Sequence, residues 1–252
     1  MKLAIIGGSL LKEISALTVI SEERIKTPFG SPSDIIVSGV INGMEVVFFN
    51  RHGFSHHLAP HQVNYRANMF VLKMLEVTDV IAITAVGGIT EKMSPMKWVI
   101  PDQIIDYTYG RFQTFNDGND KAIKHIDFSY PFDELLSNKL MRALEMASCD
   151  HETSATYGVT QGPRLETVAE IKRMQRDGCD IVGMTAMPEA ALARELEMNY
   201  AGLSLVVNWA AGMGDDMHSA SEIISMDDVY QHIEQGNVIA EKVMQNFISL
   251  LV

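Results

Sequence analysis

The stretch Gln161–Leu196, QGPRLETVAEIKRMQRDGCDIVGMTAMPEAALAREL, decides the fold class of this chain. Its pattern predicts a polar turn, an amphipathic helix over Glu166–Asp177, a short buried strand over Ile181–Met184 and a second helix over Pro188–Leu196. The strand and the second helix meet at Thr185. Small polar groups therefore collect where a strand ends, which is where α/β proteins bind ligands.

The same alternation of strand and helix continues on both sides of this stretch. Apolar patterns predict further strands at 2–6, 34–40, 45–50, 80–84, 98–105, 155–160 and 201–207, and further helices at 62–76, 132–147 and 226–251. Buried strands such as VIAIT indicate a mostly parallel or mixed sheet covered by helices. We expect a single α/β domain over residues 1–252.

Composition and charge narrow the class of protein. The chain has 252 residues, 47% of them hydrophobic, which is enough for a large core in a soluble globular protein. A net charge of −12 disfavours nucleic acid and membranes as partners. The N-terminal MKLAIIGGSLL predicts a strand rather than a signal peptide. Two cysteines, Cys149 and Cys179, favour a reducing compartment, so we expect a cytoplasmic protein.

Hydrogen-bond donors follow several of the predicted strands. In IIGGSL (5–10), the hydroxyl of Ser9 follows two glycines. Arg51 and His52 follow the strand EVVFF, and ITAVGGI (83–89) contains Thr84. Glycines let a ligand approach the backbone, and a guanidinium fork suits two phosphate oxygens. These donors predict a local anion site. The alternatives are a tight turn for IIGGSL, a surface arginine paired with a carboxylate, and an ordinary threonine at a strand end.

Together with NRHGFSHHLAPHQVNYRAN (50–68) and LSLVVNWAAG (203–212), these motifs resemble the trimeric purine nucleoside phosphorylase and methylthioadenosine phosphorylase family. The likeness covers nearly the whole chain. It implies a twisted, mixed central sheet, partly barrel-like and flanked by helices, in a homotrimer. It also implies a phosphate site formed by Ser9, Arg51, His52, Thr84, Ala85 and Thr185. Phe54 departs from the basic residue common in the family, and His56 and His57 either line the pocket or are solvated.

The resemblance places Glu166 and Asn208 at the base of a nucleoside. A carboxylate accepts a hydrogen bond from N1-H of a 6-oxopurine, whereas adenine presents an acceptor there. Adenine-preferring members carry Asp at the positions of Asn208 and Ala210, so both residues favour a 6-oxopurine. Glu166 could instead be a first-turn helix residue, and Asn208 a cap of the turn. Leu165 replaces the usual aromatic ring, so base stacking is either weaker or supplied by another ring such as Trp209.

The resemblance also assigns the sugar end of the site. Met184 matches a methionine that faces the ribose, although a core role is the default for any one methionine. Met226 stands where members that act on a free 5'-hydroxyl carry a histidine, and Val229 would face the same pocket. An apolar lining favours a methylthio group. His125 resembles a residue that reaches the 5' end from the neighbouring subunit.

The implied reaction is phosphorolysis of the N-glycosidic bond, with Asn208, Arg51 and His52 as catalytic residues. The specific expectation is conversion of S-methyl-5'-thioinosine and phosphate to hypoxanthine and 5-methylthioribose 1-phosphate, in purine salvage. The alternatives are an enzyme for inosine and guanosine or for methylthioadenosine, and a non-catalytic nucleoside-binding protein. We expect neither a metal nor an organic cofactor, with phosphate as co-substrate. The segment from Ala211 to Glu222 has the composition of a lid.

Overall fold

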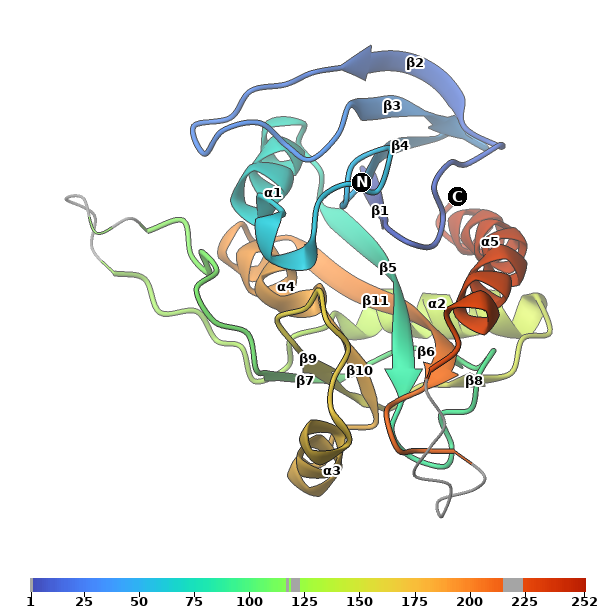
Figure 1. Ribbon diagram of the computed structural model, residues 1–252. Helices are drawn as coiled ribbons and strands as arrows, with labels where there is room; N and C mark the ends of the chain where they lie inside the picture. Colours follow the sequence, from blue (N-terminus) through green and yellow to red (C-terminus); the bar gives the residue numbers. More distant parts are fainter. Residues whose placement is uncertain (1, 117, 119–122, 215–223) are drawn as a thin grey trace.

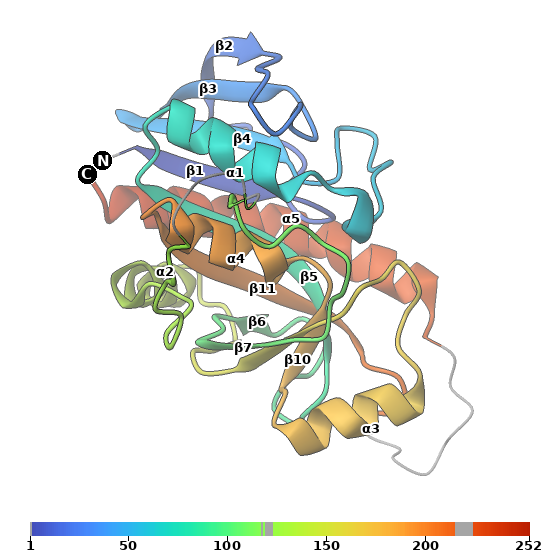
Figure 2. The same ribbon diagram turned by 90° about the vertical axis from the view of Figure 1, so that its left-hand side faces the viewer.

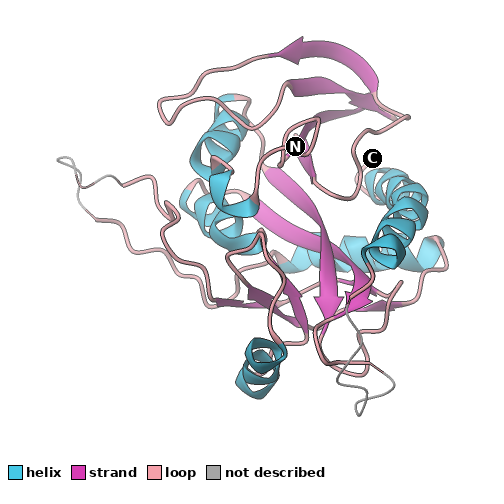
Figure 3. Ribbon diagram, viewed as in Figure 1, coloured by secondary structure: helices cyan, strands magenta, loops and turns pink. Residues whose placement is uncertain are grey.

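The computed structural model describes residues 2–116, 118, 123–214 and 224–252. Residues 215–223, which contain most of the expected lid, lie outside this set. The described part is a mixed sheet with helices on both faces, as the sequence predicted (Figure 1, Figure 3). None of its helices is long and apolar enough to cross a bilayer.

The sheet is organised around one long strand, β5 (Asp79–Gly88). Its first half pairs in parallel with β1 (Leu3–Gly7), and its whole length pairs in parallel with β11 (Asn199–Trp209). Its last residues pair antiparallel with β10 (Ile181–Gly183). Because β5 has three partner strands, the sheet divides and curls at this point, which produces the expected partly barrel-like form.

Shorter strands extend the sheet on both sides of this centre. On one side, β4 (Met44–Asn50) pairs in parallel with β1, and β3 (Ile36–Ile41) and β2 (Thr18–Glu23) follow antiparallel. On the other, β9 (Thr156–Val159) pairs in parallel with β10 and with β7 (Gln103–Asp106). Two short strands complete the sheet: β6 (Trp98–Val99) pairs antiparallel with β11, and β8 (His151–Glu152) pairs in parallel with β6.

Helices cover the two faces of the sheet (Figure 2). One face carries α1 (Tyr65–Met74) and α4 (Ala186–Glu195), and the other α2 (Glu134–Met146) and the long α5 (Met226–Ser249). The 3-10 turn η1 (Pro60–Gln62) precedes α1, and α3 (Val168–Asp177) covers the end of β10. A separate apolar core lies on each face, because the buried strands are hydrophobic on both sides.

Several elements differ from the predicted ones. The strand expected over residues 80–84 continues to Gly88, so Thr84 lies within β5 rather than at its end. The strand expected over residues 98–105 is two strands, because Pro101 cannot donate to the sheet and the chain changes partner from β11 to β9. The strand β2 was missed, since its side chains are mostly exposed and its sequence lacks an apolar alternation. The helix α3 starts at Val168 rather than Glu166, because the Thr167 side chain caps it.

Candidate functional site

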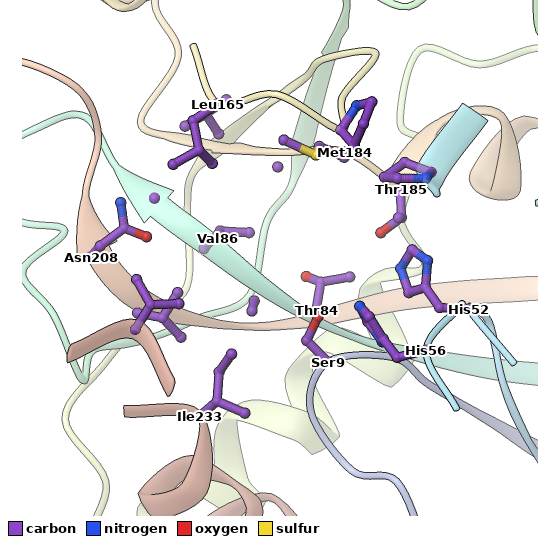
Figure 4. A pocket seen from close by; sticks show the side chains of 18 of the residues that line it. Ser9, His52, His56, Thr84, Val86, Leu165, Met184, Thr185, Asn208 and Ile233 are labelled. Carbon is purple, nitrogen blue, oxygen red and sulfur yellow. The ribbon is translucent and has the colours of Figure 1, made fainter. Parts of the chain in front are cut away.

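A cavity of about 500 Å³ lies where the central strands end (Figure 4). Its walls come from the carboxyl ends of β1, β4, β5 and β11, from the end of β10, and from the start of α5. Parallel strands bring their carboxyl ends to one edge of a sheet, so residues far apart in sequence meet here. All six predicted phosphate residues line this cavity, namely Ser9, Arg51, His52, Thr84, Ala85 and Thr185.

Most predicted nucleoside residues line the same cavity. They are Leu165, Glu166, Met184, Asn208, Ala210, Met226 and Val229. Trp209 does not: successive side chains of a strand point to opposite faces, so Asn208 faces the cavity and Trp209 packs against Gly214 instead. His125 is exposed and lies away from the cavity of its own chain. Its expected place in a neighbouring subunit stays a prediction.

Arg51 is buried and paired with a carboxylate that the sequence reading did not single out. Its Nε and Nη2 donate to the two carboxylate oxygens of Glu189 at 2.6 and 2.8 Å, and both side chains are at most 1% exposed. The Tyr200 hydroxyl donates to Glu189 Oε1 at 2.9 Å. Burial alone would lower the pKa of Arg51, but the Glu189 carboxylate raises it above its ordinary value. The alternative of a surface arginine paired with a carboxylate is therefore contradicted: Arg51 is paired with a carboxylate, but the pair is buried.

This pair leaves one nitrogen of Arg51 for a ligand. Nη1 makes only long contacts, 3.4 Å each, to the carbonyl oxygens of Gly7 and Ile83. A Cβ on Gly8 would lie 3.0 Å from Nη1, so the glycine keeps this nitrogen accessible from the backbone turn after β1. A neutral ion pair with one unused donor orients an anion without adding net charge to the wall.

His52 is held in its neutral form. Its Nδ1 lies 2.8 Å from the carbonyl oxygen of Leu58, which can only accept, so Nδ1 carries the hydrogen. Burial, and next the charge of Arg51, lower the pKa of His52 to about 4. Nε2 is then an acceptor. The His56 ring packs on it with centroids 4.6 Å apart, and burial lowers its pKa as well. The sequence left open whether His56 and His57 line the pocket or are solvated, and both line the cavity.

Thr84 has a fixed partner behind the cavity. Its Oγ1 lies 2.8 Å from the Oγ of Ser204 on β11, and Ser204 is fully buried. Thr84 and Ser204 face each other in the parallel register of β5 and β11. In Figure 4, Thr84 lies beside Ser9, His52 and Thr185, so the hydroxyls gather at one end of the cavity. We call this end, with Arg51, the anion end.

The opposite end carries Glu166 and Asn208. Glu166 Oε1 accepts a hydrogen bond of 2.6 Å from the Thr160 hydroxyl, which leaves Oε2 available. Asn208 Nδ2 donates to the Trp209 carbonyl at 2.7 Å, so one of its two hydrogens is used. Both side chains are half-buried. A carboxylate oxygen and an amide hydrogen are thus free to meet a polar ring edge. We call this the base end.

An apolar wall joins the two ends. It comes mainly from the start of α5, where Met226, Val229 and Ile233 line the cavity one helical turn apart, together with Ile224. The sequence reading missed Ile224 and Ile233. The spacing of 226, 229 and 233 is a helical stripe and could have indicated Ile233. The side chains of Ile224, Met226, Val229 and Ile233 offer no hydrogen-bond partner to a sugar hydroxyl, and Tyr230 on the same helix lines the cavity beside them.

Comparison with known proteins identifies relatives over almost the full length. A probable S-methyl-5'-thioinosine phosphorylase of Pseudomonas syringae pv. tomato is 48% identical over 233 residues, covering 92% of each chain. Its counterpart in Xanthomonas campestris pv. campestris is 44% identical over 235 residues, covering 93% of this chain and 92% of its own. A 6-oxopurine nucleoside phosphorylase of Pyrococcus furiosus is 42% identical, covering 89% and 86%.

A solved structure has the same fold. The methylthioadenosine phosphorylase of Schistosoma mansoni, crystallised with adenine, superposes with a TM-score of 0.92 at 29% identity, over 100% of this chain and 92% of its own. The profile of the family described as Phosphorylase superfamily matches residues 2–249. The chain therefore belongs to the Phosphorylase superfamily.

Proposed function

We propose that this protein catalyses phosphorolysis of S-methyl-5'-thioinosine, giving hypoxanthine and 5-methylthioribose 1-phosphate. The observation that carries the proposal is a single cavity that places oxyanion donors at one end, Glu166 and Asn208 at the other, and an apolar wall between them. The dimensions and the polar groups suit a nucleoside with phosphate beneath its sugar.

The base end favours a 6-oxopurine. The free Oε2 of Glu166 accepts from N1-H of hypoxanthine, and the remaining amide hydrogen of Asn208 donates to N7 or O6. Adenine would place a lone pair against the carboxylate, which leaves buried polar groups unpaired. Ala210 lines the cavity beside Asn208 and adds no second carboxylate to accept from a 6-amino group.

The sugar end favours an apolar 5' substituent. Met226, Val229 and Ile233 present methyl and thioether groups where the base and anion ends place the 5' carbon. A free 5'-hydroxyl against these three side chains would lose its hydrogen bonds to water without gaining one from them. A methylthio group fills the same space without that cost.

In the reaction, a phosphate oxygen forms a bond to C1' while the bond from C1' to N9 breaks. The electron pair of that bond passes to the purine, which leaves as an anion and then takes up a proton from solvent. Asn208 stabilises this charge, and Arg51 Nη1 with the Thr84 and Thr185 hydroxyls orients phosphate under C1'. Neutral His52 accepts a hydrogen bond from a P–OH group through Nε2. No metal or organic cofactor takes part in these steps.

We further propose a homotrimer in the cytoplasm. His125 lies exposed on the segment between β7 and α2, far from its own cavity, so a neighbouring chain is where it can meet a 5' substituent. Both cysteines are free, in keeping with a reducing compartment. Light scattering gives the subunit count, and a His125→Ala variant should raise KM for the nucleoside while leaving KM for phosphate unchanged.

The decisive experiment compares kcat/KM for S-methyl-5'-thioinosine, inosine, guanosine and methylthioadenosine, with and without phosphate. We expect base release only with phosphate, and fastest from S-methyl-5'-thioinosine. A clear preference for methylthioadenosine would refute the reading of Glu166 and Asn208. Release without phosphate would indicate a hydrolase, and no release under either condition a binding protein.

A further inference from the structure

The hydroxyl of Tyr157, on β9, is buried directly behind the cavity. The side chain is 1% exposed, and its hydroxyl oxygen has no hydrogen-bond partner among the residues that the structure describes. Buried polar groups are nearly always paired, so an unpaired phenol needs an explanation. Nothing in the reaction described above uses it.

A glycine makes room for this hydroxyl. Tyr157 pairs with Ile181 of β10, and its ring extends beside that strand toward Gly183. A Cβ added to Gly183 would lie 2.1 Å from the Tyr157 hydroxyl oxygen and 2.7 Å from Cζ. Gly183 does not have a positive φ, so space rather than backbone conformation requires a glycine here. Gly183 itself lines the cavity, so the phenol lies one residue behind the wall.

Two threonines of the anion end belong to the strands and turn around the phenol: Thr185 lies two residues after Gly183, and Thr84 lies on β5, which pairs with β10. Burial raises the pKa of Tyr157, while the hydroxyls of Thr84 and Thr185 act to lower it. The phenol is therefore protonated and can donate. Thr84 already has Ser204 as a partner at 2.8 Å. Thr185 is the N-cap residue of α4, yet its side chain makes no capping hydrogen bond.

We propose that Tyr157 is a positioning residue for phosphate, acting through Thr185. A threonine hydroxyl has one hydrogen to donate. When that hydrogen goes to a phosphate oxygen, the Thr185 oxygen becomes the acceptor for the Tyr157 hydroxyl, and the two hydrogen bonds strengthen each other. Without phosphate, the Tyr157 hydroxyl has no hydrogen-bond partner among the described residues. This inference rests on the proposed phosphate site.

The test uses Tyr157→Phe, which removes only the hydroxyl. We expect KM for phosphate to rise about three- to tenfold, the loss of one neutral hydrogen bond. KM for S-methyl-5'-thioinosine should stay unchanged. The melting temperature without ligand should not fall, because the lost hydroxyl had no partner, while the shift produced by added phosphate should shrink. Tyr107→Phe is the matched control: it loses a hydrogen bond of 2.8 Å to Asp177, outside the cavity.

A double-mutant cycle identifies the route. In a Thr185→Val background, Tyr157→Phe should add less than twofold to KM for phosphate, because the two hydroxyls act as one unit. Additive effects, equal rises in both KM values, or a wild-type KM for phosphate in Tyr157→Phe would each overturn the inference. If the wild-type protein shows no phosphorolysis, the proposed function fails, but the phosphate-induced melting shifts of these variants still decide whether Tyr157 positions the anion.

Discussion

The two ends of the cavity are built in different ways. At the anion end, the groups proposed to bind phosphate are buried and have partners behind them: Arg51 on Glu189, and Thr84 on Ser204. At the base end and along the apolar wall, Leu165 and Met226 are 44% and 45% exposed and lie at helix starts. The anion end is part of the buried core. The base end and the apolar wall, which together form the nucleoside end, contain side chains that are partly exposed to solvent.

This difference predicts how each end responds to substitution. A change at the anion end disturbs buried polar groups that support the fold, so stability and phosphate use should fall together. A change at Leu165, Glu166, Asn208 or Met226 touches a half-buried or exposed side chain, so it should alter substrate choice with little effect on stability.

The largest effect is expected from Glu189→Ala, which leaves the charge of Arg51 buried without a partner. The free energy of unfolding should fall by about 3–5 kcal/mol, measured by urea denaturation. The double variant Arg51→Met with Glu189→Leu should recover most of that stability but not phosphorolysis. Wild-type stability in Glu189→Ala would show that the anion end is not part of the core.

A pH effect of similar size is expected from His52. Its pKa is about 4 in the folded protein, against about 6.5 for an ordinary histidine, so the unfolded chain takes up the proton first. The stabilisation is complete above pH 6.5 and is lost as the pH falls toward 4, by up to about 3 kcal/mol. His52→Gln should flatten this part of the stability profile, measured by urea denaturation from pH 8 to 4. An unchanged slope would contradict the neutral buried form.

At the base end, Asn208→Asp with Ala210→Asp should shift preference toward the 6-aminopurine. We expect the ratio of kcat/KM for methylthioadenosine over S-methyl-5'-thioinosine to rise on the order of 100-fold, because the new carboxylates accept from the 6-amino group. KM for phosphate should remain within about twofold, which is the internal control. An unchanged substrate ratio would refute the base assignment.

The smallest effect is expected on the apolar wall. Met226→His places a donor where a 5'-hydroxyl would lie, and should improve inosine over its methylthio analogue by about five- to tenfold in kcat/KM. Val238→His, on an exposed turn of the same helix outside the cavity, is the control and should leave the ratio as in the wild type. Equal effects of the two substitutions would contradict the placement of the wall.

The strand and helix periodicities of the sequence predicted the α/β class, the main strands and all five α-helices, with ends displaced by a few residues. The resemblance brought Ser9, Arg51, Thr84 and Thr185 to one site, and the structure does place them in one cavity. The polar partners behind that site were not predicted. Glu189 lies within an apolar helix pattern, and a pattern in one helix carries no information about an arginine 138 residues away.

The sequence by itself determined which residues form strands and helices, and which strand ends carry polar side chains, because both follow from local periodicity and residue chemistry. Only the tertiary structure decided how each polar group is paired. The register shift between Val206 and Asn208 on β11, the room that Gly183 leaves for Tyr157, and the burial of Glu189 on Arg51 all arise between distant segments. Hydrogen bonds of this kind depend on distances and directions that exist only after the sheet has formed.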